Sequence, residues 1–186
     1  ADQKTLRVKT DDSLLYLFPG YQINCLEKIE VLAMGLSTPL RDGLSLEETI
    51  KEIRDRNAIP ILPWGAGKWL FTRGRQVEKI LPLSKKYSLL FADTFLRPRC
   101  LPDSGLIKKI HTLQKSLLAG SDPLPLKGEE KFLGKYATLF EGDFNPETPL
   151  SSMQALLLSD SLSFSSLGKR NSLPEFLFRQ TRCLLR

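Results

Sequence analysis

Strand-like and helix-like segments alternate along this sequence at a nearly constant spacing, and this repeat limits the folds open to the chain. Apolar, partly β-branched runs occur at residues 29–36, 58–63, 87–93 and 116–120. Their centres lie roughly 29 residues apart, close to the length of one βα unit of about 30 residues. Right-handed crossovers between such strands build a parallel sheet. The pattern therefore predicts an α/β protein.

The segments between these runs carry the signals of amphipathic helices. Ser45 is expected as an N-cap, with Glu48 completing a capping box before an apolar stripe. A second helix is predicted over 75–81, and a third begins at Asp103 or Ser104. About four or five βα units are too few for an eight-stranded barrel. The sheet is therefore either open or part of a shortened barrel.

The rest of the chain completes a prediction of a single domain over residues 1–186. Residues 159–173 are rich in serine and are predicted as a loop. Residues 174–186 are predicted as a C-terminal helix that begins at Pro174. Further predicted elements are a hairpin, or a strand and a turn, at 13–18 and 21–26, a strand at 135–142 and a helix at 151–158.

The sequence contains a single histidine, His111. Zinc centres built on several histidines cannot be assembled from this chain alone. A Ser-His-Asp or Cys-His mechanism would have to use His111. Because this residue borders the apolar face of a predicted helix and does not lie in a strand-end loop, we expect it to be structural or solvent-facing.

Composition predicts a cytoplasmic protein that interacts with anions and not with membranes. The cysteines Cys25, Cys100 and Cys183 are widely spaced and form no C-x-x-C pair, as expected in a reducing compartment. No apolar run reaches the roughly 18 residues of a membrane span, and the polar opening ADQKTLRVKTDDS has no signal-peptide core. The 27 Lys and Arg against 21 Asp and Glu give a net charge of +6. This excess suits an anionic small molecule or nucleic acid.

Loops that follow the strands are the expected place for a site, because parallel α/β folds bind ligands beyond the carboxyl ends of their strands. The loop WGAGKWLFTRGR after 58–63 combines glycines, which let the backbone approach a ligand, with cations that can bind phosphate. The competing interpretations are a solvated basic loop whose two tryptophans cover the sheet, and a protein interface. The predicted anion-binding residues are Trp64, Gly67, Lys68, Arg73 and Arg97.

Three segments resemble the polymerase and histidinol phosphatase (PHP) domain family. They are FPGYQINCLEKIEVLAMGL, LSLEETIKEIRDRNAIPILPWGAGKW and LLAGSDPL, and they span roughly residues 13–135. The resemblance implies a distorted, TIM-barrel-like (β/α) barrel with parallel strands and outer helices, here incomplete or shortened. It also implies a phosphoesterase site with two or three metal ions, of the kind found in metal-dependent hydrolases.

Most positions at which this family has metal ligands carry other residue types here. The family's glutamate and two of its histidines correspond to Gln22, Trp64 and Leu124, and Asp122 is the one ligand retained, with Asp93 a further candidate. The opening H-x-H strand of the family has no counterpart. A pair of carboxylates with one neutral amide can hold a divalent cation loosely. It cannot hold two bridged catalytic metals.

We therefore expect a PHP-like domain that has lost most of its metal ligands and binds a phosphorylated or acidic small molecule at the carboxyl ends of its strands. Apart from a loosely held divalent metal, no cofactor is indicated. One alternative is a metal-dependent phosphoesterase of which this sequence is an incomplete chain. Another is a nucleic-acid-binding module, because basic and aromatic residues are interleaved in the chain.

Overall fold

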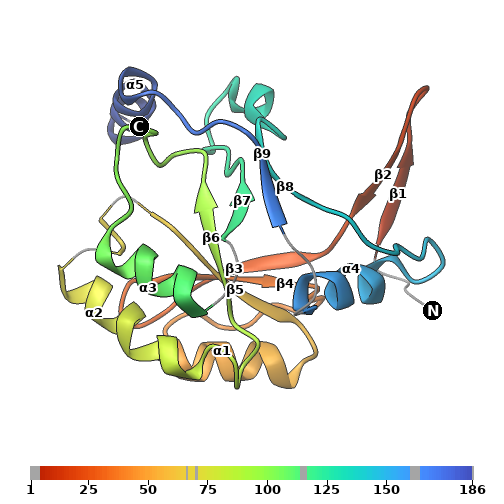
Figure 1. The fold of residues 1–186 in the computed structure, drawn as a ribbon, viewed down its shortest axis with the longest axis horizontal. Helices are drawn as coiled ribbons and strands as arrows, with labels where there is room; N and C mark the ends of the chain where they lie inside the picture. Colours follow the sequence, from red (N-terminus) through yellow and green to blue (C-terminus); the bar gives the residue numbers. More distant parts are fainter. Residues whose placement is uncertain (1–4, 66, 70, 114–116, 160–163, 186) are drawn as a thin grey trace. The chain divides into compact units, whose positions relative to one another are not determined.

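The computed structural model describes residues 5–65, 67–69, 71–113, 117–159 and 164–185. No helix in these ranges has the length and apolar composition needed to cross a membrane. The single-domain organisation stays a prediction. The chain divides into two compact units, of which the first comprises Ala1–Leu62, Pro82–Leu90 and Glu141–Leu162, and the second Pro63–Leu81, Phe91–Phe140 and Ser163–Arg186. Figure 1 shows the helices and strands along the chain, coloured from the N-terminus to the C-terminus.

The largest sheet has the strand order β3-β4-β5-β6-β7 and is mixed. β3 (Gly20–Asn24) pairs antiparallel with β4 (Glu30–Met34), and β4 pairs antiparallel with β5 (Ile59–Pro63). β6 (Leu90–Thr94) and β7 (Leu118–Gly120) are parallel. The predicted PHP-like barrel with parallel strands is therefore wrong, because within the described ranges the sheet has antiparallel neighbours and does not close. The fold is a mixed α/β arrangement.

β5 runs antiparallel to β4 because the chain passes along the sheet once more between β4 and the helix that follows it. The segment after β4 runs back along the sheet, where the N–H of Gly43 donates to the carbonyl of Asn24 (2.8 Å). α1 (Leu46–Asp55) then returns toward the end of β4. β5 starts there, with Ile59 opposite Met34, and runs antiparallel. In a simple βα unit the helix itself makes the return pass, which leaves the next strand parallel.

α1 begins with the capping box that the sequence predicts. The N–H of Glu48 donates to the Ser45 hydroxyl (3.3 Å), and the N–H of Ser45 donates to the Glu48 carboxylate (3.1 Å). The Ser45 hydroxyl and N–H bonds together lower the pKa of the Glu48 carboxyl. The apolar stripe of the helix is buried, with Ile50 and Ile53 both 0% exposed. Local capping and burial of one face therefore fix this helix in the first unit.

The remaining helices also lie close to their predicted positions. α2 and α3 occupy the segments before and after β6, and the last helix begins one residue before Pro174. This last helix starts with a second capping box, between Ser172 and Glu175. The helices are α2 (Phe71–Ile80), α3 (Gly105–Leu113), α4 (Pro149–Leu158) and α5 (Leu173–Leu184).

Two antiparallel pairs lie outside the main sheet. β1 (Leu6–Lys9) pairs with β2 (Leu14–Leu17), so β2 does not form a hairpin with β3. β8 (Tyr136–Phe140) pairs with β9 (Phe164–Gly168). β9 lies inside the segment 159–173, for which the sequence predicted a serine-rich loop. The structure instead has a strand there, because the serines pair with β8, while 160–163 lie outside the described residues.

Thr138 of β8 joins the β8–β9 pair to β7. Its hydroxyl accepts a hydrogen bond from the N–H of Ala119 (2.7 Å) and donates one to the carbonyl of the same residue (3.1 Å). One side chain thus satisfies both main-chain groups of a residue on an edge strand. This link anchors the β8–β9 pair beside β7 in the second unit.

We expect Thr138→Val to destabilise the protein by about 1–3 kcal/mol, because it leaves both main-chain groups of Ala119 without their partner. The free energy of unfolding in urea measures the loss. Thr138→Ser keeps the hydroxyl and should retain most of the stability. Equal losses for both variants would show that the methyl group, and not the hydroxyl, carries the effect.

Candidate functional site

A pocket of about 490 Å³ lies beside the carboxyl end of β6, and all of its lining residues belong to the second unit. Four cationic side chains and two carboxylates line it, an excess of two positive charges. These charged residues come from β6, the loop after it and the segment that follows β9. They are Arg97, Arg99, Lys169 and Arg170, with Asp93 and Asp103.

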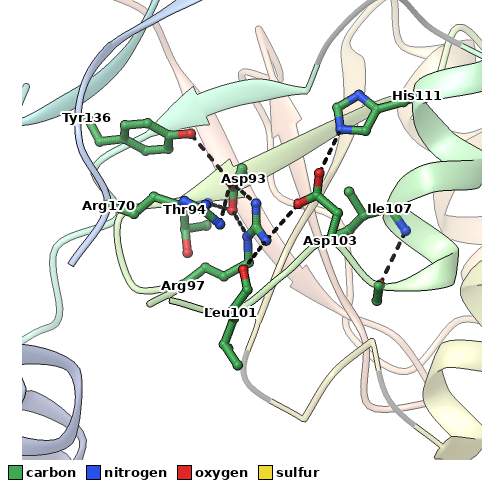
Figure 2. Close-up of polar contacts among 10 residues, drawn as sticks. Asp93, Thr94, Arg97, Leu101, Asp103, Ile107, His111, Tyr136 and Arg170 are labelled. Carbon is green, nitrogen blue, oxygen red and sulfur yellow. Dashed lines mark hydrogen bonds and ion pairs between the residues drawn. The ribbon is translucent and has the colours of Figure 1, made fainter. Parts of the chain in front are cut away.

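The carboxylate of Asp93 is the centre of the polar network in this pocket (Figure 2). Asp93 is 4% exposed. Its Oδ1 accepts hydrogen bonds from the N–H of Thr94 (3.0 Å) and from Nε of Arg97 (2.8 Å). Its Oδ2 accepts from Nη2 of Arg97 (2.7 Å) and from the Tyr136 hydroxyl (3.4 Å). Each oxygen therefore has two donors, which uses the accepting capacity of the carboxylate.

Arg97 connects the two carboxylates of the pocket. Its Nη1 donates to Oδ1 of Asp103 (3.0 Å), while its other nitrogens hold Asp93. Burial opposes the charged form, but the hydrogen bonds and charges of Asp93 and Asp103 outweigh burial and raise the pKa of Arg97. Arg97 lines the pocket, yet its charge is balanced inside the protein. It holds the pocket together more than it attracts a ligand.

Asp103 comes directly before Ser104, which caps the start of α3, and this cap fixes where the loop after β6 meets the helix. Oγ of Ser104 accepts a hydrogen bond from the N–H of Ile107 (3.3 Å) at the start of α3. Oδ2 of Asp103 lies 3.7 Å from Nε2 of His111 on the last turn of α3. The single histidine, for which a structural or solvent-facing role was expected, therefore forms part of the pocket wall.

Main-chain hydrogen bonds bring the cations of two distant segments together. The N–H of Asn171 donates to the carbonyl of Phe95 (3.0 Å), and the N–H of Arg99 donates to the carbonyl of Asn171 (2.9 Å). The chain enters this pairing through Gly168, whose φ of 84° favours glycine. A Cβ added at Gly168 would collide with the carbonyl oxygen of Lys135. The bend at the end of β9 therefore depends on this glycine.

Arg170 is the cation that keeps an unused hydrogen-bond donor. Its side chain is 20% exposed, and its Nη1 lies 3.6 Å from Oδ2 of Asp93. That nitrogen is buried and has no hydrogen-bond partner among the described residues. Because the Asp93 oxygens already have their donors, they do not satisfy Arg170. A ligand in the pocket would contact the part of the Arg170 side chain that stays exposed, and not this buried nitrogen.

Tyr136 closes the network on the side of β8. It is 8% exposed, and its hydroxyl donates to Asp93. Burial and the negative charge of Asp93 raise the pKa of the Tyr136 phenol, although Arg170 and Arg97 oppose the shift. The phenol therefore stays protonated around neutral pH and acts as a donor to Asp93.

None of the described residues of the segment 64–75 lines this pocket, and those from Phe71 onward belong to α2. The side chain of Lys68 packs on Gly65, where an added Cβ would lie 2.5 Å from its Cδ. Trp69 is buried and packs edge-on against Phe91 of β6, with ring centroids 6.2 Å apart. This packing favours the interpretation in which a tryptophan covers the sheet. The predicted residues that do not line the pocket are Trp64, Gly67, Lys68 and Arg73, and their shared site with Arg97 stays a prediction.

The residue types at the expected metal-ligand positions do not fit a site with two or three metal ions. Gln22 lies on β3 in the first unit, and Trp64, Asp122 and Leu124 belong to the second. Trp64 and Leu124 offer no side-chain atom that binds a metal, which leaves one carboxylate and one amide. Within the described ranges, no group of three or more His, Cys, Asp or Glu is placed to hold a metal ion. Asp122 as a single weak ligand stays a prediction.

No protein-family model matches this chain, and no curated protein matches its sequence. The resemblance to the PHP family therefore stays a prediction. The chemistry of the pocket itself is the basis for a functional proposal.

The cationic end of the pocket was missed by reasoning from sequence alone. Arg99 was visible only as a residue after a strand, and the doublet of Lys169 and Arg170 lay at the end of a predicted loop. The adjacent cations Lys169 and Arg170 are a local pattern that can be recognised in the sequence. Their place in the pocket depends on the pairing of β8 with β9, which connects segments far apart in the sequence.

We expect Asp93→Asn to lower the free energy of unfolding by about 3 kcal/mol or more, because it leaves the buried Arg97 without its closest counter-charge. Asp103→Asn is the matched control. The Asp103 side chain is 40% exposed, so its loss should cost about 1 kcal/mol or less. Urea unfolding measures both. Similar losses for the two variants would contradict the central role given to Asp93.

The raised pKa of Tyr136 predicts a specific loss of stability in alkali. In the unfolded chain the phenol ionises near its ordinary pKa of 10.0, whereas in the folded protein it stays protonated to higher pH. The contribution of the protonated Tyr136 phenol to the free energy of unfolding is therefore fully present below about pH 10. It is lost as the pH rises through the pKa of the phenol in the folded protein. The stability difference between wild type and Tyr136→Phe should be constant up to about pH 10 and fall as the pH rises further. Urea unfolding across this range would show a constant difference if the expectation is wrong.

Proposed function

We propose that the pocket in the second unit binds a small molecule that carries a phosphate or another anionic group. The observation that carries the proposal is the excess of cations in the pocket, whose lining includes four cationic side chains and two carboxylates. Guanidinium groups bind phosphate and carboxylate oxygens through charge-assisted hydrogen bonds. Arg170, which lines the pocket, is therefore one contact for the anion.

Arg99 and Lys169 strengthen this contact from the rim. Both are exposed, both line the pocket, and neither forms an ion pair with a described carboxylate. Arg97 differs because Asp93 and Asp103 balance its charge. The pocket thus separates cations that build its wall from cations that attract a ligand.

The proposal is binding without metal-assisted turnover. A metal-dependent phosphoesterase needs two metals held by several ligands, and the residues at the expected positions do not supply them. A nucleic-acid-binding module is the remaining alternative, and binding measurements separate it from a small-molecule site. The proposal also includes a cytoplasmic location, which the three free cysteines support.

We expect inorganic phosphate to bind the protein and Arg99→Gln/Lys169→Gln to weaken that binding by about tenfold or more, because it removes two charge-assisted contacts. Isothermal titration calorimetry at constant ionic strength measures the affinity. Lys51→Gln/Lys79→Gln removes the same charge from exposed positions outside the pocket and should leave the affinity nearly unchanged.

Two further measurements place the site. Lys68→Ala/Arg73→Ala tests the loop at 64–75, and unchanged phosphate binding is expected for this variant. Loss of binding in it would move the site to that loop. Binding of mixed-sequence DNA that falls steeply with salt, without binding of phosphate, would overturn the proposal in favour of a nucleic-acid-binding module.

A further inference from the structure

The pocket continues along β9 beyond the cations that hold the proposed anion. In the antiparallel register, Tyr136 lies opposite Gly168, and Phe140 lies opposite Phe164. Directly opposite residues share one face of a strand pair, and residues two apart on a strand also share it. Phe164, Ser166 and Gly168 therefore belong to the same face as Tyr136, and all four line the pocket.

The length of this wall exceeds what a phosphate ion can contact. The four residue steps from Phe164 to Gly168 span roughly 13 Å at the rise of a β-strand. Lys169 and Arg170 follow directly after Gly168, so the cations lie at one end of the wall and Phe164 at the other. A ligand that contacts both ends must therefore have an organic part attached to its anionic group.

The end of the wall near Phe164 has the chemistry of a site for a planar apolar group. Phe164 packs edge-to-face on Phe140, with ring centroids 5.8 Å apart, which fixes the orientation of its ring. Leu117 adds a second apolar side chain to the lining. Aromatic rings of ligands stack on such side chains in a way that depends little on their substituents.

The middle of the wall is polar and carries no charge of its own. Ser166 of β9 is exposed and lines the pocket between the apolar end and the cations. A serine hydroxyl donates and accepts hydrogen bonds, which matches a ligand segment that bears hydroxyl groups. Along β9 the pocket therefore offers an apolar contact, a hydroxyl group and positive charge in that order.

We propose that the ligand is a phosphate ester in which a hydroxylated segment joins the phosphate to an aromatic ring system, the chemical class that includes nucleoside monophosphates. This inference rests on the proposed function, because it uses the same pocket and the same anion contacts. The phosphate binds Arg170 and the rim cations, the hydroxylated segment contacts Ser166, and the ring packs against Phe164.

Calorimetry with adenosine 5′-monophosphate, ribose 5-phosphate and inorganic phosphate tests the three parts separately on the wild-type protein. We expect the nucleotide to bind about tenfold or more tightly than ribose 5-phosphate, because its ring adds one stacking contact. Equal affinities for these two esters would overturn the inference and leave the anion site intact. Absence of binding by all three compounds would overturn the proposed function as well.

Phe164→Leu tests where the ring lies, since leucine keeps an apolar side chain and removes the aromatic face. We expect this variant to lose most of the preference for the nucleotide and to keep its affinity for inorganic phosphate. Leu167→Ala is the matched control, because Leu167 lies on the same strand, is 57% exposed and does not line the pocket. An unchanged preference in a folded Phe164→Leu protein would overturn the assignment. The wild-type comparison decides the ligand class even if this variant does not fold.

Discussion

The buried carboxylate of Asp93 is the constraint on which the pocket depends. A charge at 4% exposure needs a counter-charge close by, and Arg97 supplies it through two hydrogen bonds. This requirement fixes the path of the loop after β6. The same guanidinium then orients Asp103, and Asp103 faces His111 at the end of α3. One ion pair thus sets the positions of residues from a strand, a loop and a helix.

The same ion pair is compatible with the proposed binding of anions in a pocket that has two carboxylates. Arg97 and Tyr136 use the oxygens of Asp93, so Arg170 lies near a negative charge without a hydrogen bond to it. The carboxylate keeps Arg170 in place electrostatically at the wall of the pocket. Preorganisation of this kind reduces the entropy cost of binding, because the cation is already positioned before the ligand arrives.

Local signals in the sequence predicted the elements better than their arrangement. The capping box at Ser45 and the apolar runs that became β4, β5 and β6 depend on neighbouring residues, and the structure confirms them. The barrel was wrong because the pass of chain before α1 reverses β5, and no periodic pattern marks such a pass. The pocket was only partly predictable. Arg97 follows a predicted strand, whereas Arg170 reaches the pocket through β9, whose serines resemble a loop.

The bend at Gly168 fixes both the local path of the chain and the positions of Lys169 and Arg170 in the pocket. Because the carbonyl of Lys135 occupies the space of a side chain there, a change at this glycine would alter the path that carries Lys169 and Arg170 together. Under the proposed function, homologous proteins that bind different anions are expected to vary at the two cations and to keep the glycine. A lineage that lost the glycine would lose both cations from the pocket in a single step.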